Sequence, residues 1–163
     1  MDHDTIEYAK DNLRYEPDTG NIMWNKHGAG RRSDGIAGTL HHSGYIYVWL
    51  KGKQYGAHRL AFLLMGEVIP EEVDHVDGNP SNNVWGNLRS ANKYQNMQNT
   101  RRSSNNKSGY KGVGYFPKYG KWRARIGFRG KQKFLGYFDT PEEAYKAYCE
   151  AANTYHKEFA RYE

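Results

Sequence analysis

The chain has 163 residues, of which 26% are charged and 15% aromatic, and a formal net charge of +6. This length allows one ordinary domain or two small ones, and two small ones would rely on aromatic burial for their stability. No apolar run approaches the roughly 18–20 residues of a membrane span, and the single cysteine, Cys149, excludes an internal disulfide and a cysteine-ligated zinc site.

Residues 1–72 are expected to form a small scaffold rich in strands. The expected elements are a weakly amphipathic helix over 5–13, strands over 22–24 and 44–50, a return strand through Tyr55, and a helix over 58–65. The first residues carry neither a basic nor an apolar segment, so no secretion signal is expected. With the unpaired cysteine, this predicts a cytoplasmic protein.

Several histidines and arginines of this region have two interpretations. His58, at the start of the second helix, either touches a functional site or packs as a structural histidine, and the structural role is the more common one for such a residue. His41, His42, Arg31 and Arg32 fall in loops, where they either contact phosphates or are simply solvated.

The central stretch combines a short strand, a tight turn and a short helix. A strand over 73–76 leads into a turn at 77–80, where Gly and Asn tolerate positive φ angles. An Asn-rich loop and a brief apolar segment around Leu88 follow, and Ser90 is a suitable N-cap for a helix over 91–98. Such a strand–loop–helix unit would gather small polar side chains around one point.

Four polar residues of this unit supply the groups that metal-dependent hydrolysis requires. The Asp74 carboxylate and the Asn96 amide oxygen are hard ligands suited to Mg²⁺ or Mn²⁺, with positions left for water and a phosphate. His75 has the side chain of a general base, since an unperturbed imidazole titrates at about pH 6.5. An amide such as Asn87 can hold that ring in one tautomer. A lone Asp-His pair in a surface loop would more often be incidental, but the joint spacing of the four residues favours a site.

The pattern Asp-His-x-Asp-Gly-Asn…Asn-Asn…Asn-Leu-Arg…Asn resembles the ββα-metal motif of HNH nucleases, particularly phage and intron-encoded homing endonucleases. The upstream run Ala57-His58-Arg59-Leu60-Ala61 is typical of the same group. The resemblance implies that His75 is the general base and that Asn87 orients it. It also implies that Asp74 and Asn96 bind the metal. Many HNH enzymes have His at the last of these positions, so Asn96 favours an oxygen-rich site for Mg²⁺ or Mn²⁺.

Positive charge is concentrated in the C-terminal part of the chain. Residues 1–99 hold 10 Lys and Arg against 12 Asp and Glu, whereas residues 100–163 hold 14 against 6. No acidic residue lies between Asp77 and Asp139. A merely solvated surface mixes both signs, so a stretch of one sign that is rich in Tyr, Trp and Arg indicates a polyanionic partner.

Residues 100–108 are polar and basic, without apolar side chains, so they are expected to form a linker that does not pack into a core. The linker would become ordered on DNA. Arg101, Arg102 and Lys107 could then follow the DNA backbone.

Residues 109–163 are expected to form three strands and a helix. The strands cover 110–115, 122–129 and 132–138, and the helix runs to 155 from a capping box formed by Thr140, Pro141 and Glu143. The middle strand alternates strictly between an apolar face and a basic face. The apolar face is Trp122, Ala124, Ile126 and Phe128, and the basic face is Arg123, Arg125, Gly127 and Arg129. We therefore expect a three-stranded antiparallel sheet packed on one helix, with its basic face open.

The residues Tyr-Lys-Gly-Val…Gly-Lys-Trp-Arg-Ala-Arg-Ile…Leu-Gly-Tyr-Phe-Asp-Thr-Pro-Glu-Glu-Ala resemble the ethylene-response-factor (APETALA) type of DNA-binding domain across nearly all of 109–155. That family lays its sheet in the major groove. The resemblance implies DNA contacts at Lys111, Tyr119, Arg125, Gln132 and Phe134. Further basic candidates of this module are Arg123, Arg129, Lys131 and Lys133. Two arginine contacts of the family meet Gly114 and Gly127 here, so its sequence preference does not transfer. The alternative is a basic sheet that binds no nucleic acid.

The expected fold class is α+β. Residues 1–99 are expected to form a small ββα-metal HNH nuclease domain, with a strand-rich N-terminal scaffold and a motif core at 57–99. The linker 100–108 and a DNA-binding domain over 109–163 follow. The expected function is a site-specific endonuclease of the homing type, which hydrolyses phosphodiester bonds of double-stranded DNA as a monomer with Mg²⁺ or Mn²⁺. Two other classes stay open. One is a transcription regulator with an inactive nuclease fold, and the other is an RNA-binding or RNA-cleaving protein that stacks unpaired bases on Tyr and Trp.

Overall fold

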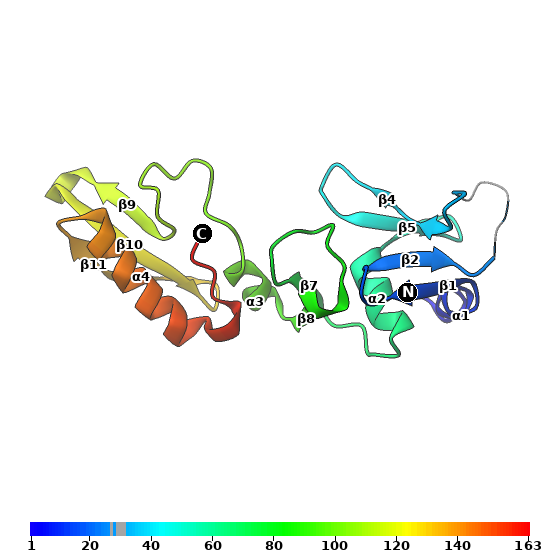
Figure 1. Cartoon of the computed structure of the whole chain (residues 1–163). Coiled ribbons are helices and arrows are strands. Elements are labelled where there is room, and N and C mark those ends of the chain that lie inside the picture. Colours follow the sequence, from blue (N-terminus) through cyan, green and yellow to red (C-terminus); the bar gives the residue numbers. More distant parts are fainter. Residues whose placement is uncertain (27, 29–31) are drawn as a thin grey trace. The chain divides into compact units, whose positions relative to one another are not determined.

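The structure of the chain, a computed structural model, describes residues 1–26, 28 and 32–163. These residues form two compact units, Met1–Ala91 and Asn92–Glu163, and most of their helices and strands are labelled in Figure 1. The α+β class is confirmed, since both units combine helices with small antiparallel sheets. Arg31, a candidate phosphate contact, lies outside the described residues. In the part of the chain that is described, no helix is both long and apolar enough to span a membrane.

The first unit contains the helices α1 (His3–Asn12) and α2 (Ala57–Leu64) and three antiparallel sheets, as far as its described residues extend. One sheet has β1 (Leu13–Glu16), β2 (Asn21–Trp24) and β3 (Ile36–Ala37) in this order. The next has β4 (Thr39–Leu40), β5 (Ile46–Leu50) and β6 (Lys53–Gly56), and the last pairs β7 (Glu72–His75) with β8 (Leu88–Ala91). The helix and strands expected around 44–65 are therefore present, each shifted by a residue or two.

Helix α2 joins two apolar clusters because it carries apolar side chains on more than one face. Leu60 is fully buried in a cluster that includes residues of α1, β1, β2 and β5. Phe62 belongs to a second cluster with Val73 of β7 and Leu88 of β8. The helix therefore fixes the β7–β8 hairpin to the scaffold, and it places His58, in its first turn, beside that hairpin.

The second unit contains a sheet with the order β11-β10-β9, formed by β9 (Val113–Phe116), β10 (Lys121–Phe128) and β11 (Lys131–Phe138). Helix α4 (Pro141–Tyr155) lies along one face of this sheet (Figure 1). It begins at the predicted capping box, in which Thr140 and Glu143 bind each other's backbone N–H groups. Its buried residues are Ala144, Tyr148, Ala151 and Ala152. This arrangement agrees with the sequence prediction.

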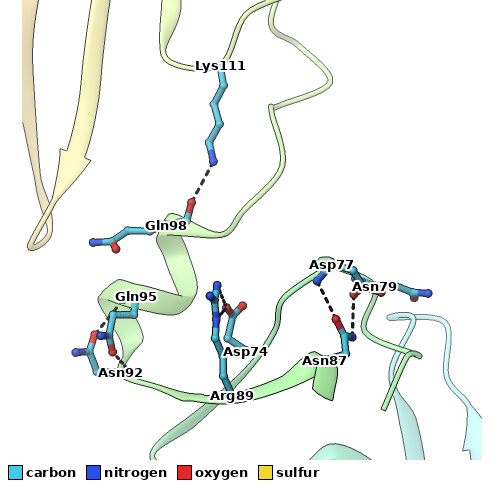
Figure 2. A network of polar contacts seen from close by, with 9 residues as sticks. All are labelled: Asp74, Asp77, Asn79, Asn87, Arg89, Asn92, Gln95, Gln98 and Lys111. Atoms are coloured by element: carbon cyan, nitrogen blue, oxygen red, sulfur yellow. Dashed lines mark hydrogen bonds and ion pairs between the residues drawn. The ribbon is translucent and has the colours of Figure 1, made fainter. Parts of the chain in front are cut away.

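The boundary between the units differs from the expected one. Helix α3 (Lys93–Gln98) belongs to the second unit, where it contacts β10. The sequence analysis had predicted that this helix is part of the nuclease domain over 1–99. Its N-cap is Asn92, which forms a capping box with Gln95, rather than Ser90 (Figure 2). Ser90 is instead part of β8. Asn92 succeeds as the cap because Gln95 stands at the N3 position, from which an amide can reach back to the cap backbone.

The segment 100–108, expected to be an unstructured linker, is held by hydrogen bonds within the second unit. The Asn106 side chain donates to the carbonyl oxygens of Tyr110 and Val113, at 2.8 and 3.2 Å. The backbone N–H of Arg102 donates to Glu163 O at 3.1 Å. Polar side chains thus order this segment in the place of the apolar core that it lacks.

Candidate functional site

His75 ends strand β7, and its imidazole is buried among aromatic rings. The His75 ring lies edge-on to the rings of His58 and Tyr45, with centroids 5.5 and 5.9 Å apart. Its Nε2 atom is 3.1 Å from Oδ1 of Asn83. Because a carbonyl oxygen only accepts hydrogen bonds, this contact requires a proton on Nε2. In the neutral ring the lone pair is then on Nδ1, the atom that would take a proton from water.

Asn83 is positioned by the scaffold. The Tyr15 hydroxyl of β1 donates to Asn83 O at 2.6 Å, and the backbone N–H of Trp85 donates to Pro17 O at 2.9 Å. Gly20, at φ +74°, lies so close that an added Cβ would stand 2.4 Å from the Asn83 carbonyl carbon. The β1–β2 turn can therefore approach Asn83 only because residue 20 is glycine.

Asn87, the predicted orienting residue, has its contacts in the turn that follows His75. Its Oδ1 accepts from Asp77 N at 3.0 Å, and its Nδ2 donates to Asp77 Oδ1 at 3.0 Å (Figure 2). The same Nδ2 also donates to Asn82 O at 2.8 Å. Although burial alone would raise it, the pKa of Asp77 is lowered by hydrogen bonds from Asn79, Asn82 and Asn87. The amide that binds the His75 ring is thus Asn83, while Asn87 braces the turn. The two share one Asn-rich loop, and the sequence pattern alone did not separate their roles.

Asp74 precedes His75 and is almost fully buried. Across the β7–β8 ladder it faces Arg89, whose Nε and Nη2 atoms lie 2.7 and 2.6 Å from Asp74 Oδ2 (Figure 2). A buried carboxylate needs a compensating charge, and Arg89 supplies it. The sequence motif includes Arg89 but predicts no role for it. The structure therefore adds the Asp74–Arg89 ion pair to the predicted site.

The donor chemistry suits an oxygen-ligated divalent ion better than a closed zinc site. Among the described residues, no group of three or more His, Cys, Asp and Glu side chains could hold a metal ion. Mg²⁺ is commonly held by only one or two carboxylates together with water and substrate phosphate. Asp74 is the carboxylate that the sequence motif predicts as a ligand. Asn96, the other predicted ligand, is on α3 in the second unit, where it is half-buried.

His58 is a second histidine of this site. Its Nδ1 is buried and has no hydrogen-bond partner among the described residues. Burial lowers the pKa of His58 to about 4, with smaller contributions from the charges of His75 and Arg59. His58 is therefore neutral at physiological pH and packs as an uncharged ring against His75, as expected for a structural histidine.

Lys111 is the predicted DNA contact whose position differs most from expectation. Its Nζ donates to the carbonyl oxygen of Gln98 at 3.0 Å (Figure 2). It also donates to the carbonyl oxygens of Thr100 and Arg161, at 2.5 and 3.1 Å. Burial, and then the charge of Arg161, lowers the pKa of Lys111 to about 8. An ammonium group bound in this way joins the end of α3 to the C-terminal segment and does not face a phosphate.

The other predicted DNA contacts are distributed over several parts of the second unit. Those that are exposed are Arg101, Arg102, Lys107, Tyr119, Arg125, Arg129, Lys131, Gln132 and Lys133. Arg123 is half-buried, with its guanidinium 4.9 Å from the centroid of the Phe116 ring. Lys133 lies over the Tyr155 ring of α4, 4.1 Å from its centroid, and so belongs to the helix side of the sheet.

Two known families match parts of the chain. Residues 55–98 match the HNH endonuclease family, and residues 108–158 match the AP2 domain family. The chain therefore contains an HNH endonuclease domain followed by an AP2 DNA-binding domain, and HNH nucleases generally use a divalent metal ion.

The chain is also similar to Protein 3.8 of Escherichia phage T7. The two are 38% identical over 60 residues, which are 37% of this chain and 50% of the phage protein. The matched region thus spans about half the length of that relative. No solved structure matches the chain.

Proposed function

We propose that this protein is a site-specific DNA endonuclease of the homing type, which hydrolyses phosphodiester bonds of double-stranded DNA in the cytoplasm of a phage host. The observation that carries the proposal is the His75–Asn83 contact beside Asp74, within a region that matches HNH endonucleases. Nuclease and DNA-binding domains in one chain suit an enzyme that binds a target and cuts it.

His75 is the general base of the proposed reaction. Its Nδ1 takes a proton from a water molecule while the water oxygen forms a bond to phosphorus. The bond from phosphorus to the 3′ oxygen breaks, and solvent protonates the leaving oxygen, so that the products carry a 5′-phosphate and a 3′-hydroxyl. Asn83 holds the His75 ring in the tautomer that this step requires.

Asp74 and Asn96 are the residues that would hold the divalent ion, Mg²⁺ or Mn²⁺. When bound, the ion supplies positive charge to the scissile phosphate and the leaving oxygen. Asp74 belongs to the first unit and Asn96 to the second.

The proposal is tested by incubating purified full-length protein with duplex DNA and sequencing the product ends. We expect cleavage at a preferred site in Mg²⁺ or Mn²⁺, with 5′-phosphate and 3′-hydroxyl ends, and no cleavage in excess chelator. Undiminished cutting in chelator would overturn the metal-dependent mechanism. Sequence-specific binding without cutting under any metal would favour a regulator with an inactive nuclease fold.

A further inference from the structure

Tyr45 is a half-buried residue beside the proposed base, and the reaction described above does not use it. It directly precedes β5, and its ring centroid lies 5.3 Å from that of His58 and 5.9 Å from that of His75. The two histidine rings are 5.5 Å apart, so each of the three rings contacts the other two. These three rings are here called the ring triad. Tyr45 is therefore held next to His75 from two sides.

The turn that leads into Tyr45 packs against the loop that follows His75. Within this turn, His41 N donates to Tyr45 O and Gly44 N donates to His41 O, both at 2.8 Å. Gly44 has a φ angle of +86°, and a Cβ added there would stand 2.9 Å from Cγ of Pro80. The β4–β5 turn can approach the loop this closely only because residue 44 is glycine. This approach brings the Tyr45 side chain to the site.

The Tyr45 hydroxyl makes no hydrogen bond with any residue that the structure describes. A tyrosine whose ring is packed usually finds a partner for its O–H group, as Tyr15 does with Asn83 O at 2.6 Å. The Tyr45 oxygen is also not one of the buried polar atoms that lack a partner among the described residues, so it is open to solvent. A packed ring with an unused and accessible donor can bind a ligand without rearrangement.

The charge around the hydroxyl keeps its proton in place. Burial raises the pKa of Tyr45 above its ordinary value of 10.0, and the charges of Tyr47, Glu72 and Asp74 raise it further. At neutral pH the group is therefore a neutral hydrogen-bond donor. The influence of Asp74 also places the hydroxyl within electrostatic range of the carboxylate that is predicted to bind the metal. The donor, the base and the predicted ligand thus belong to one site.

We propose that Tyr45 is a further catalytic residue, whose hydroxyl donates a hydrogen bond to a non-bridging oxygen of the scissile phosphate. Negative charge grows on these oxygens as water attacks phosphorus, and a donor that is already in place stabilises this charge without reorganisation. No bond forms or breaks at Tyr45, and its proton stays on the phenol oxygen throughout. The inference rests on the proposed function, because it requires that the phosphodiester bond is cut beside His75.

The chain offers a matched pair of substitutions. Tyr45→Phe removes the hydroxyl and keeps the ring, so the packing of the ring triad is preserved. Tyr55 is a half-buried tyrosine of the same unit, on β6, where it packs against the apolar cluster that contains Leu60. Tyr55→Phe therefore removes one hydroxyl from the same unit at a position outside the ring triad.

The experiment measures single-turnover cleavage of the preferred duplex by the full-length chain in Mg²⁺, with the dissociation constant for DNA measured in parallel. Tyr45→Phe should lower the cleavage rate by about 10- to 150-fold, the range for loss of one hydrogen bond to a charged group. The dissociation constant should stay within about two-fold, because the bond matters most in the transition state. Tyr55→Phe should leave both quantities within about two-fold of the unsubstituted chain.

A second measurement separates contact with the phosphate from an effect on the fold. Each non-bridging oxygen of the scissile phosphate is replaced in turn by sulfur, which accepts hydrogen bonds only weakly. If the Tyr45 hydroxyl binds one of these oxygens, sulfur at that position should slow the unsubstituted chain more than it slows Tyr45→Phe. At the other position the two changes should act independently, so that their effects on the rate multiply.

Three results would overturn the inference. The first is a Tyr45→Phe protein that cuts at the unsubstituted rate. The second is a slower Tyr45→Phe protein whose loss multiplies with the sulfur effect at both positions, which would give the hydroxyl a structural role only. Both results leave the proposed function intact, because the unsubstituted chain still cuts the duplex. The third is an unsubstituted chain that cuts no duplex in any metal, which would overturn the proposed function and this inference together.

Discussion

The guanidinium of Arg89 lies against the carboxylate of Asp74, with Nη2 and Nε at 2.6 and 2.7 Å from the same oxygen, Oδ2. Their side chains are 20% and 4% exposed. This ion pair joins β7 to β8 directly beside His75 in the sequence. The stability of the β7–β8 hairpin therefore depends on the charges of Asp74 and Arg89.

Arg89→Met should lower the free energy of unfolding by about 3–5 kcal/mol, because it leaves a buried carboxylate without its compensating charge. Urea unfolding followed by circular dichroism measures the loss. Saturating Mg²⁺ or Mn²⁺ should recover more stability in this variant than in the unsubstituted chain, since a cation beside Asp74 replaces the missing charge. Arg32→Met, which breaks the exposed pair with Asp34, is the control and should leave the free energy of unfolding nearly unchanged. Equal losses in the two variants would contradict the role given to Arg89.

Asn83→Ala should lower the single-turnover cleavage rate by about 10- to 100-fold, because the His75 ring loses the hydrogen bond that fixes its tautomer. Asn87→Ala should instead mainly lower stability, because the turn loses the hydrogen bonds that Asn87 makes to Asp77 and Asn82. Measuring the cleavage rate and the unfolding free energy for each variant separates the two roles. Asn82→Ala, which removes another side-chain hydrogen bond to Asp77 and leaves Asn83 in place, is the control and should lower stability more than the cleavage rate. A normal rate in Asn83→Ala with a reduced rate in Asn87→Ala would restore the role that the sequence pattern gave to Asn87.

The stability of the chain should depend on pH through His58. The pKa of His58 is lowered from 6.5 to about 4, mainly by burial. Between these values the unfolded chain binds a proton here that the folded chain does not. The contribution of His58 to stability is therefore present above pH 6.5 and lost as the pH falls toward 4, by up to about 3 kcal/mol. Unfolding free energies measured across this range should fall less steeply in His58→Phe, and unchanged steepness would show that His58 is not buried in this way. His3→Phe, at an exposed position, should keep the original slope.

Lys111→Met should lower the unfolding free energy by about 1–3 kcal/mol, because three carbonyl oxygens lose a charged donor. The salt dependence of DNA binding should not change. Lys107→Met is the opposite case. The Lys107 side chain is exposed, so the unfolding free energy should stay the same. The slope of the logarithm of the duplex-binding constant against the logarithm of the salt concentration should fall by about 0.9 for each phosphate that is no longer neutralised. If Lys111→Met reduced the slope and left stability intact, Lys111 would be the DNA contact that the family resemblance implies.

The features that were predictable from the sequence are those decided by neighbouring residues. The start of α4 follows from Thr140, Pro141 and Glu143, which cap the helix whatever surrounds it. The alternation along β10 predicts its two faces in the same way. The Asp-His pair at the end of β7 was predictable from its spacing to Asn87 and Asn96 in the motif.

The features that were not predictable depend on residues far apart in the chain. Lys111 is bound by Arg161 and by the end of α3, and neither partner can be inferred from its neighbours. The choice between Asn83 and Asn87 depends on how an Asn-rich loop meets the β1–β2 turn, through contacts such as Tyr15 to Asn83.

The most direct test of His75 as the general base compares the unsubstituted chain with His75→Ala on its preferred duplex, with single-turnover cleavage and DNA binding measured in parallel. Loss of a positioned base should reduce the cleavage rate by about 10²- to 10⁴-fold, while the dissociation constant for DNA stays the same because the AP2 domain is untouched. A His75→Ala protein that cuts at the unsubstituted rate would contradict the assignment.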